Sequence, residues 1–312
     1  MSTEFDQKLE RLKSVATCSV REDVLLAPLT TFRVGGKADI LAEPKNEIEL
    51  LELVNHLNEI GIPYFYLGLG SNLLVSDAGI RGVVIRSRGD LASMSIDDTI
   101  VTAGPAARLL LLTTFAARHS LSGLEQLSGI PGTVGGGLFM NAGAYGGEIS
   151  DTLIDVRVMT PSLEIKTFSK NDISFGYRSA PELRDVIVLA SRYQLKRAEQ
   201  SDIFSEMRRV WRLRREKQPI EFPSAGSIFK RPPGDFAGRL IEAAGCKGLR
   251  IGGATVPTTH AGIFINDRAG TATEIAELIR TVRTRVRDQF SVILENEILP
   301  VGFDADPFEL KT

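Results

Sequence analysis

Two glycine-rich stretches and three side chains carry the residue types best suited to chemistry. The longer stretch, SGIPGTVGGGLFMNAGAYGGEIS, spans residues 128–150 and includes Asn141 and Tyr145. Because glycine costs backbone entropy on folding, a cluster indicates positive φ angles or close backbone approach. Bare backbone N–H groups on such a bend form an anion-binding nest. We interpret this stretch as a cradle for the pyrophosphate and ring system of a flavin nucleotide; a structural turn is the alternative.

The shorter glycine-rich stretch, YFYLGLGSNLLVSD, spans residues 64–77. Because it comes earlier in the chain, we call it the first glycine-rich loop and residues 128–150 the second. It predicts a strand, a glycine turn and then Ser71 and Asn72. It is not a GxGxxG sequence, and no helical pattern follows, so the dinucleotide rule of the Rossmann fold does not apply. A strand–turn–strand unit can still present N–H groups to a diphosphate. An ordinary turn is the alternative.

Arg178, Ser227 and Glu297 are the candidate reactive side chains. Arg178 follows an aromatic residue in FGYRSA, Ser227 lies in PSAGSIFK, and Glu297 lies in the apolar run of LENEI. An isolated arginine is usually a surface or ion-pair residue, and a serine without a GxSxG sequence is usually a turn residue. A glutamate among apolar residues is favoured in its neutral form.

Composition excludes several function classes. The 312 residues carry a net charge of −2, so no overall field attracts nucleic acid or a membrane surface. The only cysteines are Cys18 and Cys246, which argues against a disulfide framework or a zinc site and fits a reducing cytosol. The N-terminus lacks the apolar region of a secretory signal, and no apolar run is long enough to span a membrane. We therefore expect a cytoplasmic protein without a metal site.

Hydrophobic periodicity predicts an α+β fold. Helices are predicted at 5–16, 47–60, 106–119, 201–217, 236–244 and 271–290. Strands are predicted at 82–86, 99–103, 155–160, 164–168, 186–195, 254–266 and 292–299. The helix at 201–217 ends in several basic residues, which indicate a solvated face or a patch that faces phosphate. We predict two domains, 1–200 in two lobes with a core at about 30–197, and 201–312.

The sequence resembles the UDP-N-acetylenolpyruvoylglucosamine reductases (MurB) over nearly its whole length. The resemblance rests on six stretches that occur in order: TTFRVGGKAD, LGLGSNLLVSD, SGIPGTVGGGLFMNAGAYGGEI, FGYRSA, PSAGSIFK and LENEI. Any one of them is weak evidence, and their joint occurrence is specific. The chain lacks extra tyrosine-bearing insertions and is similar to the shorter, second type of the family.

The resemblance implies a two-lobed FAD-binding domain of the vanillyl-alcohol-oxidase (PCMH) type and a C-terminal substrate domain. It implies that NADPH reduces FAD, and that the enolpyruvyl group of UDP-N-acetylglucosamine-enolpyruvate is then reduced to give UDP-N-acetylmuramate for peptidoglycan. A UDP-sugar and NADPH are the expected partners, without nucleic acid or membrane, and a monomer is expected. Another FAD-dependent oxidoreductase of the same fold and a non-catalytic nucleotide-binding protein are the alternatives.

The resemblance also implies roles for individual residues. The implied catalytic residues are Arg178, Ser227 and Glu297. The implied cofactor-binding residues are Gly68, Gly70, Ser71, Asn72, Leu74, Gly132, Gly135, Gly136, Asn141, Ala142, Gly143 and Tyr145. The implied substrate-binding residues are Tyr177, Arg214, Lys217 and Lys230. Three positions depart from the family pattern: Asn296 replaces a proline, Leu299 stands at a commonly basic position, and Arg231 replaces an asparagine.

These roles agree with the charge flow of the expected reaction. Hydride addition to an enol ether leaves negative charge on the adjacent carbon and its carboxylate, and electrostatic stabilisation of such charge is usually the largest catalytic contribution. The Arg178 guanidinium binds a carboxylate as a planar fork, and a protonated Glu297 can donate a hydrogen bond to it. Ser227 is the expected proton donor to the carbanionic carbon.

Overall fold

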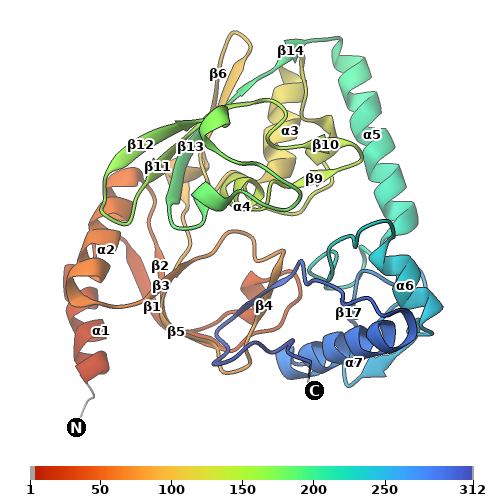
Figure 1. Ribbon diagram of the computed structural model, residues 1–312. Coiled ribbons are helices and arrows are strands. Elements are labelled where there is room, and N and C mark those ends of the chain that lie inside the picture. The colour runs from red at the N-terminus through yellow and green to blue at the C-terminus, as the bar shows by residue number, and fades with distance from the viewer. Residues whose placement is uncertain (1–3, 311–312) are drawn as a thin grey trace. The chain divides into compact units, whose positions relative to one another are not determined.

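The computed structural model describes residues 4–310, and its fold divides into two compact units that are discontinuous in sequence. Unit 1 contains the described residues up to Glu22, Ile40–Leu69 and Gly82–Leu213; unit 2 contains Asp23–Asp39, Gly70–Arg81 and the described residues from Arg214 onward. Both units combine helices and strands, which confirms the predicted α+β class (Figure 1). The predicted domain boundary between residues 200 and 201 stays a prediction.

The first sheet has the strand order β1-β2-β5-β3. Its strands are β1 Ser19–Leu25, β2 Lys37–Glu43, β5 Ile80–Ile85 and β3 Tyr64–Tyr66. In unit 1, helices α1 (Glu4–Val15) and α2 (Glu47–Ile60) share an apolar core with β2 and β5. Asn46 caps α2 by accepting a hydrogen bond of 2.9 Å from Glu49 N. β3 pairs in parallel with β5, and this pairing fixes the start of the first glycine-rich loop.

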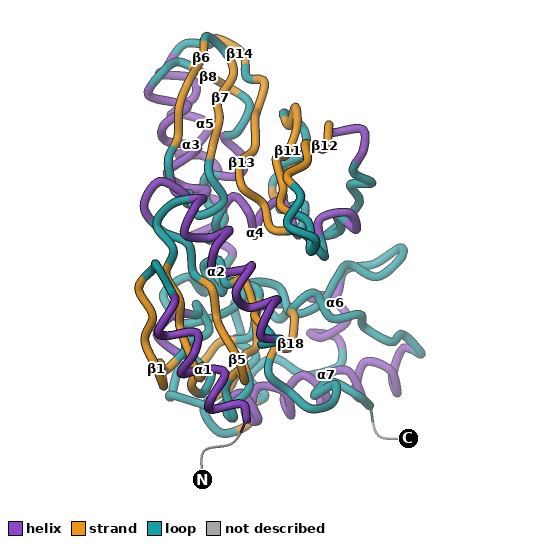
Figure 2. The backbone as a smooth tube through the Cα atoms, turned by 90° about the vertical axis from the view of Figure 1, so that its left-hand side faces the viewer, coloured by secondary structure: helices purple, strands orange, loops and turns teal. Residues whose placement is uncertain are grey.

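The second sheet, also in unit 1, has the order β12-β11-β13-β7-β6, and all its pairings are antiparallel (Figure 2). Its strands are β12 Ile165–Ser169, β11 Leu153–Met159, β13 Ile187–Gln194, β7 Ile100–Ala103 and β6 Met94–Asp97. The antiparallel β11–β12 pair confirms the strands predicted at 155–160 and 164–168. Helices α3 (Leu109–Arg118) and α4 (Val134–Phe139) contribute to the apolar core on which this sheet packs.

Two short strand pairs complete the paired strands of unit 1. They are β9 Gly143–Ala144 with β10 Gly147–Glu148, and β8 Leu121–Ser122 with β14 Lys196–Arg197. Helix α5 (Gln200–Lys217) follows β14 and buries Ile203, Met207 and Val210. Short 3₁₀ turns lie at Ala27–Leu29, Gly89–Ala92, Glu125–Leu127, Lys170–Asp172 and Pro181–Leu183. No helix within residues 4–310 has the length and apolar character needed to cross a membrane.

Unit 2 is built around a long helix and several very short strands. Its elements are β4 Leu73–Val75, α6 Ala237–Ala243, β15 Arg250–Ile251, β16 Ala254–Thr255, β17 Ile265–Asn266, α7 Ala272–Phe290 and β18 Leu299–Val301. Asp77 anchors the inserted segment 70–81 to α7, because its carboxylate accepts hydrogen bonds of 2.8 and 2.9 Å from Ala272 N and Thr273 N. These contacts place a negative charge at the positive end of the helix.

Three sequence predictions about elements are wrong in detail. The strand predicted at 292–299 is an extended segment with one isolated bridge between Phe229 and Asn296, and regular pairing begins only at Leu299. The strand predicted at 254–266 is two separate strands joined by a turn-rich loop. The helix predicted at 106–119 begins at Leu109, and the six-residue α4 inside the glycine-rich stretch was not predicted.

Candidate functional site

Arg178 lies at the tip of a tight turn in unit 1. Gly176 and Ser179 close this turn with backbone hydrogen bonds of 2.9 and 3.1 Å. Arg178 itself has a φ of +56°, which is strained for a residue with a side chain. Its Nη2 donates to Gly143 O at 3.1 Å, and its guanidinium carbon lies 5.1 Å from the ring centre of Tyr177. The turn and these contacts hold the guanidinium beside the second glycine-rich loop.

Asn141 joins the turn at Gly176–Ser179 to the glycine-rich residues 128–150. It is fully buried, and its Nδ2 donates to Glu148 Oε2 at 2.7 Å and to Gly176 O at 3.1 Å. Among the described residues, its buried Oδ1 has no hydrogen-bond partner. An unpaired buried acceptor costs about 1–3 kcal/mol. The amide oxygen is therefore suited to an N–H donor from a bound molecule, such as the ring N–H of a flavin.

Within the glycine-rich residues 128–150, the short helix α4 has Thr133 as its N-cap. Thr133 precedes α4 and accepts a hydrogen bond of 3.3 Å from Gly136 N. Gly135 N donates to Pro105 O at 2.9 Å, and a Cβ at Gly135 would lie 3.2 Å from the Pro105 side chain. Close packing of two backbones therefore explains Gly135. Gly132 O accepts a hydrogen bond of 3.0 Å from Leu109 N, at the start of α3.

The end of this stretch is a small hairpin. Ala142 N donates to Gly137 O at 2.7 Å, and Gly143 begins strand β9. A Cβ at Gly143 would lie 2.7 Å from Glu148 Cγ, so a larger residue there would force a shift. Tyr145 lies in the turn between β9 and β10 with a φ of +52°. Arg178, Tyr177, Asn141 and Gly143 are thus predicted site residues that unit 1 brings together.

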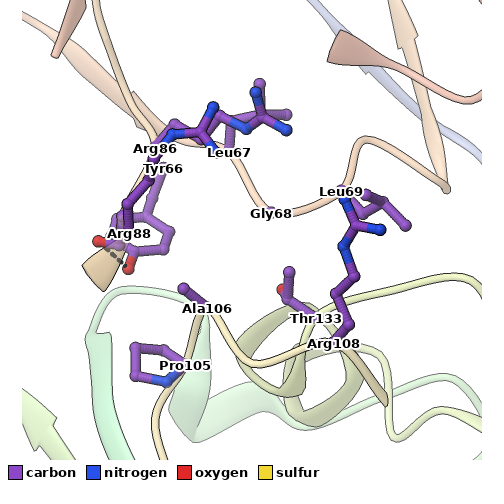
Figure 3. Close-up of a pocket in the computed structure, with 11 residues that line it drawn as sticks. Tyr66, Leu67, Gly68, Leu69, Arg86, Arg88, Pro105, Ala106, Arg108 and Thr133 are labelled. Atoms are coloured by element: carbon purple, nitrogen blue, oxygen red, sulfur yellow. Dashed lines mark hydrogen bonds between the residues drawn. The ribbon is translucent and has the colours of Figure 1, made fainter. Parts of the chain in front are cut away.

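A pocket in unit 1 lies at the end of β3 (Figure 3). Its empty space is about 440 Å³, which includes open solvent at the mouth. Its lining residues come from β3 and the loop after it, from the residues that follow β5, from the segment before α3, and from the residue before α4. They are Tyr66, Leu67, Gly68, Leu69, Arg86, Ser87, Arg88, Pro105, Ala106, Arg108 and Thr133. Gly68 is required there, because a Cβ would lie 2.7 Å from Thr133 Oγ1.

The pocket is strongly basic. Arg88 donates to Glu43, which also accepts from Arg21. Burial lowers the pKa of Arg86, and the neighbouring positive charges of Arg88 and Arg108 lower it further against the opposing effect of Glu43. Tyr66 donates to Ser87 Oγ at 2.6 Å, and burial raises the pKa of this tyrosine to about 12.

Sequence reasoning identified only Gly68 in this pocket and missed its arginines and Thr133. The signal for Thr133 was the threonine just before VGGG, which is an N-cap pattern. The signal for Arg86 and Arg88 was the alternation RSR at the end of a predicted strand, which places both arginines on one face.

Ser227 and Glu297 belong to unit 2, where the backbone joins their two segments. Ile228, the residue after Ser227, accepts a hydrogen bond of 2.8 Å from Glu297 N through its carbonyl oxygen. Asn72 Nδ2 donates to Glu297 O at 2.9 Å. Glu297 is 9% exposed, and Ser227 is half-buried. Unit 2 therefore brings together three predicted residues, from the first glycine-rich loop, the serine loop and the C-terminal segment.

The other predicted residues of the first loop are packed into unit 2. Gly70 has a φ of +65°, its carbonyl accepts a hydrogen bond of 3.2 Å from Thr31 N, and a Cβ would lie 2.8 Å from Leu29 O. Ser71 is half-buried, whereas the Leu74 side chain is fully buried in the apolar core. The roles of these residues toward a cofactor stay predictions.

The predicted substrate-binding cations lie on α5 and in the loop that follows Phe229. Arg214 and Lys217 are in the last turn of α5, where Lys217 is exposed. Lys230 pairs with Glu295, with 2.5 Å between Nζ and Oε1, and its N–H donates to Glu295 O at 2.8 Å. Their substrate-binding roles stay predictions.

The three residues that depart from the family pattern make contacts within unit 2. Asn296 forms the bridge with Phe229, Leu299 pairs with Leu73 in the parallel β4–β18 ladder, and the Arg231 guanidinium carbon lies 4.9 Å from the ring centre of Phe236.

These residues fit FAD as a cofactor. The basic pocket suits the phosphates of a dinucleotide, and the unpaired Asn141 Oδ1 suits an N–H donor.

Comparison with known proteins identifies both parts of the chain. Residues 38–169 match the model of an FAD binding domain, and residues 218–301 match the C-terminal domain of UDP-N-acetylenolpyruvoylglucosamine reductase. The UDP-N-acetylenolpyruvoylglucosamine reductase of Streptococcus pyogenes is 46% identical over 91% of this chain and 96% of its own length. Reductase 2 of Bacillus cereus is 41% identical over 92% of this chain and 94% of its own length.

A solved structure agrees with these matches. The crystal structure of UDP-N-acetylenolpyruvylglucosamine reductase (MurB) from Thermus caldophilus is similar with a TM-score of 0.79 and 37% identity, covering 91% of this chain and 99% of that one. The predicted family and the FAD prediction are confirmed by these findings. The chain belongs to the UDP-N-acetylenolpyruvoylglucosamine reductase (MurB) family and is an FAD-dependent oxidoreductase.

Proposed function

We propose that this protein reduces the enolpyruvyl group of UDP-N-acetylglucosamine-enolpyruvate to give UDP-N-acetylmuramate, with NADPH as the reductant. The support comes from the named relatives, which this chain matches over more than nine-tenths of their length. When bound, FAD supplies the hydride that the double bond receives. The residues of the chain bind the substrate, stabilise the charge that develops on it and deliver a proton.

Arg178 stabilises the anion that forms next to the substrate carboxylate. A guanidinium offers five N–H donors in a planar fork that matches a carboxylate, and one of these already donates to Gly143 O. The strained turn fixes the guanidinium before substrate arrives. Little reorganisation is then needed when charge develops, which is the condition under which electrostatic stabilisation is strongest.

Ser227 donates the proton, and Glu297 assists at the carboxylate. The observation that carries this assignment is the hydrogen bond between Glu297 N and Ile228 O, since it ties the serine loop to the glutamate. In its protonated form, Glu297 donates a hydrogen bond to the substrate carboxylate. A serine hydroxyl is a weak acid, so it protonates only a strongly basic carbon. Tyr177, Arg214, Lys217 and Lys230 are proposed to bind the rest of the substrate.

The test separates the two half-reactions in a stopped-flow instrument. Ser227→Ala should leave the bleaching of the flavin by NADPH within about twofold of wild type, while reoxidation by the enolpyruvyl substrate should slow by roughly 10²–10⁴-fold. Equal losses in both half-reactions would refute the role of Ser227. Wild-type protein that binds FAD but never oxidises NADPH in the presence of substrate would refute the proposed function.

The same proposal includes the setting of the reaction. We infer a cytoplasmic monomer that acts on a small UDP-sugar. Elution of the purified protein at about its chain mass on size exclusion, and recovery of the native protein in the soluble cell fraction, are the expected results.

A further inference from the structure

Arg283 lies on α7 and joins the backbone of two other segments of unit 2. Its Nε donates a hydrogen bond of 3.0 Å to Leu294 O, and its Nη1 donates to Phe308 O. Leu294 and Phe308 are buried in the apolar core, and Arg283 itself is half-buried. Hydrogen bonds from a charged donor are stronger than neutral ones, and the planar guanidinium fixes the direction of both. The side chain is therefore a rigid link between α7 and two stretches of backbone.

Few hydrogen bonds hold the chain between the end of α7 and Glu297. Among the described residues, 292–294 make one hydrogen bond, which is the bond from Arg283 to Leu294 O. Backbone bonds resume one residue later, at Glu295 O, which lies 2.8 Å from its donor nitrogen. The guanidinium therefore directs the backbone as it approaches Glu297.

Both donors of Arg283 bind backbone carbonyl oxygens rather than a side chain. Burial lowers the pKa of Arg283, and the nearby negative charge of Asp306 opposes this effect. The Asp306 carboxylate has its own contact, because its Oδ1 accepts a hydrogen bond of 2.9 Å from Phe308 N. A partly buried charge is tolerated when its donors are satisfied. Loss of either carbonyl partner would be costly, so guanidinium and backbone hold each other in one geometry.

Arg280 is the matched comparison, one turn earlier on the same helix. It is also half-buried, and its Nη1 donates a hydrogen bond of 2.5 Å to Pro307 O. Of the two arginines, both hold the segment 307–308, but only Arg283 also binds the segment before Glu297. The two positions thus separate the support of Glu297 from the anchoring of 307–308.

We propose that Arg283 is a positioning residue for Glu297, which acts through the backbone at Leu294 to set where the glutamate side chain meets the substrate carboxylate. Arg283 itself touches neither substrate nor cofactor in this assignment. The inference rests on the role of Glu297 in the proposed function and extends it to a residue outside the six motif stretches. Displacement of a catalytic group by about 1 Å can cost roughly 10²-fold in rate, so such support matters.

The experiment follows reoxidation of the reduced flavin by the enolpyruvyl substrate in single turnovers. Arg283→Met should slow the limiting rate by about tenfold or more, with the half-saturating substrate concentration within about twofold of wild type. A general loosening of unit 2 would instead change both values. Flavin reduction by NADPH should not change. Arg283→Lys keeps the charge but not the fork and should recover part of the rate. Arg280→Met is the control and should reoxidise as wild type does.

A double variant tests whether Arg283 acts through the glutamate. Glu297→Gln alone should slow reoxidation, and Arg283→Met should add no further loss in that background, because the group that it positions has already been removed. A further loss by the same factor would overturn the inference, as would a wild-type rate for Arg283→Met or an equal loss for Arg280→Met. Urea unfolding identifies any variant that does not fold, and Arg283→Lys then takes the place of Arg283→Met.

Hydrogen exchange separates this inference from the proposed function, because it needs no substrate. Measured by mass spectrometry, the peptide that contains residues 292–299 should exchange faster in Arg283→Met than in Arg280→Met or wild type. Equal exchange in all three would overturn the inference whatever the substrate is. Faster exchange in a protein whose wild type never turns over the enolpyruvyl substrate would refute the proposed function and leave the link from Arg283 to Glu297 standing. If Glu297→Gln is slow while Arg283→Met is not, only this inference fails.

Discussion

Asn72 donates a side-chain hydrogen bond of 2.9 Å to the backbone carbonyl of Glu297, across 225 positions of sequence. The same residue accepts a hydrogen bond of 3.0 Å from Leu299 N through its backbone oxygen. Asn72 therefore holds both sides of Glu297. Together with the bond from Glu297 N to Ile228 O, these contacts fix the backbone of the proposed catalytic glutamate within unit 2.

Replacement of Asn72 by alanine should lower the stability of the protein and the rate of flavin reoxidation. The Glu297 carbonyl would lose its donor, which costs about 1–3 kcal/mol where water cannot replace it. Urea unfolding measures the first effect, and stopped-flow reoxidation by substrate measures the second. Asn55→Ala is the control, because it removes an exposed hydrogen bond on α2. Wild-type values for both measurements would show that the Asn72 bond does not position Glu297.

Replacement of Arg178 by lysine should slow reoxidation by roughly 10²-fold or more while flavin reduction by NADPH changes little. Lysine keeps the positive charge but cannot form the planar fork, and loss of one well-placed donor typically costs this much. Single-turnover absorbance traces provide both rates. Arg184→Lys, an exposed position in the same unit, should behave as wild type. Full activity of Arg178→Lys would mean that charge alone suffices.

Local sequence signals predicted those parts of the site that depend on local chemistry. The glycine-rich stretches and the helices predicted at 47–60 and 271–290 follow from residue type and hydrophobic periodicity, which are local features of the chain. The pocket arginines could not be predicted in the same way. Arg86 and Arg108 are separated along the chain, and only the tertiary fold places them in one pocket.

The C-terminal segment shows why a strand prediction can fail. The alternation in VILENEIL predicts a strand, but the backbone groups of this segment do not pair in register with one neighbouring strand. Glu297 N and Ile298 N both use Ile228 O, and Leu294 O accepts from Arg283 Nε at 3.0 Å. Side chains, one shared carbonyl and the backbone bond from Lys230 N to Glu295 O replace a regular ladder, and no local sequence pattern indicates such partners.

Gly70→Ala should destabilise the protein more than Gly245→Ala does. Both glycines have nearly the same positive φ, +65° and +66°. The strain of placing alanine in that conformation, about 1 kcal/mol, is therefore common to both. A Cβ at Gly70 would also lie 2.8 Å from Leu29 O, whereas nothing lies within 4 Å of one at Gly245. Urea unfolding of both variants compares them, and equal losses would show that the loop around Gly70 yields without cost.

Protonation of His260 should make the protein less stable in mild acid. Burial lowers the pKa of His260 below its ordinary value of about 6.5, and the nearby charge of Lys247 lowers it further, against a backbone hydrogen bond that raises it. Among the described residues its buried Nδ1 has no hydrogen-bond partner. Below pH ~6.5 the unfolded chain therefore binds a proton that the folded chain does not, so stability falls as the pH falls toward the folded-state pKa.

His260→Asn should flatten this part of the stability profile, because asparagine does not titrate. Urea midpoints measured from neutral to mildly acidic pH for wild type and variant give the two slopes, and their difference isolates the histidine from the carboxylates that titrate at lower pH. The same replacement at exposed His119 accounts for any effect of changing surface charge. Identical slopes for wild type and His260→Asn would mean that the folded chain protonates His260 as easily as the unfolded chain does, and that its buried ring nitrogen is hydrated in solution.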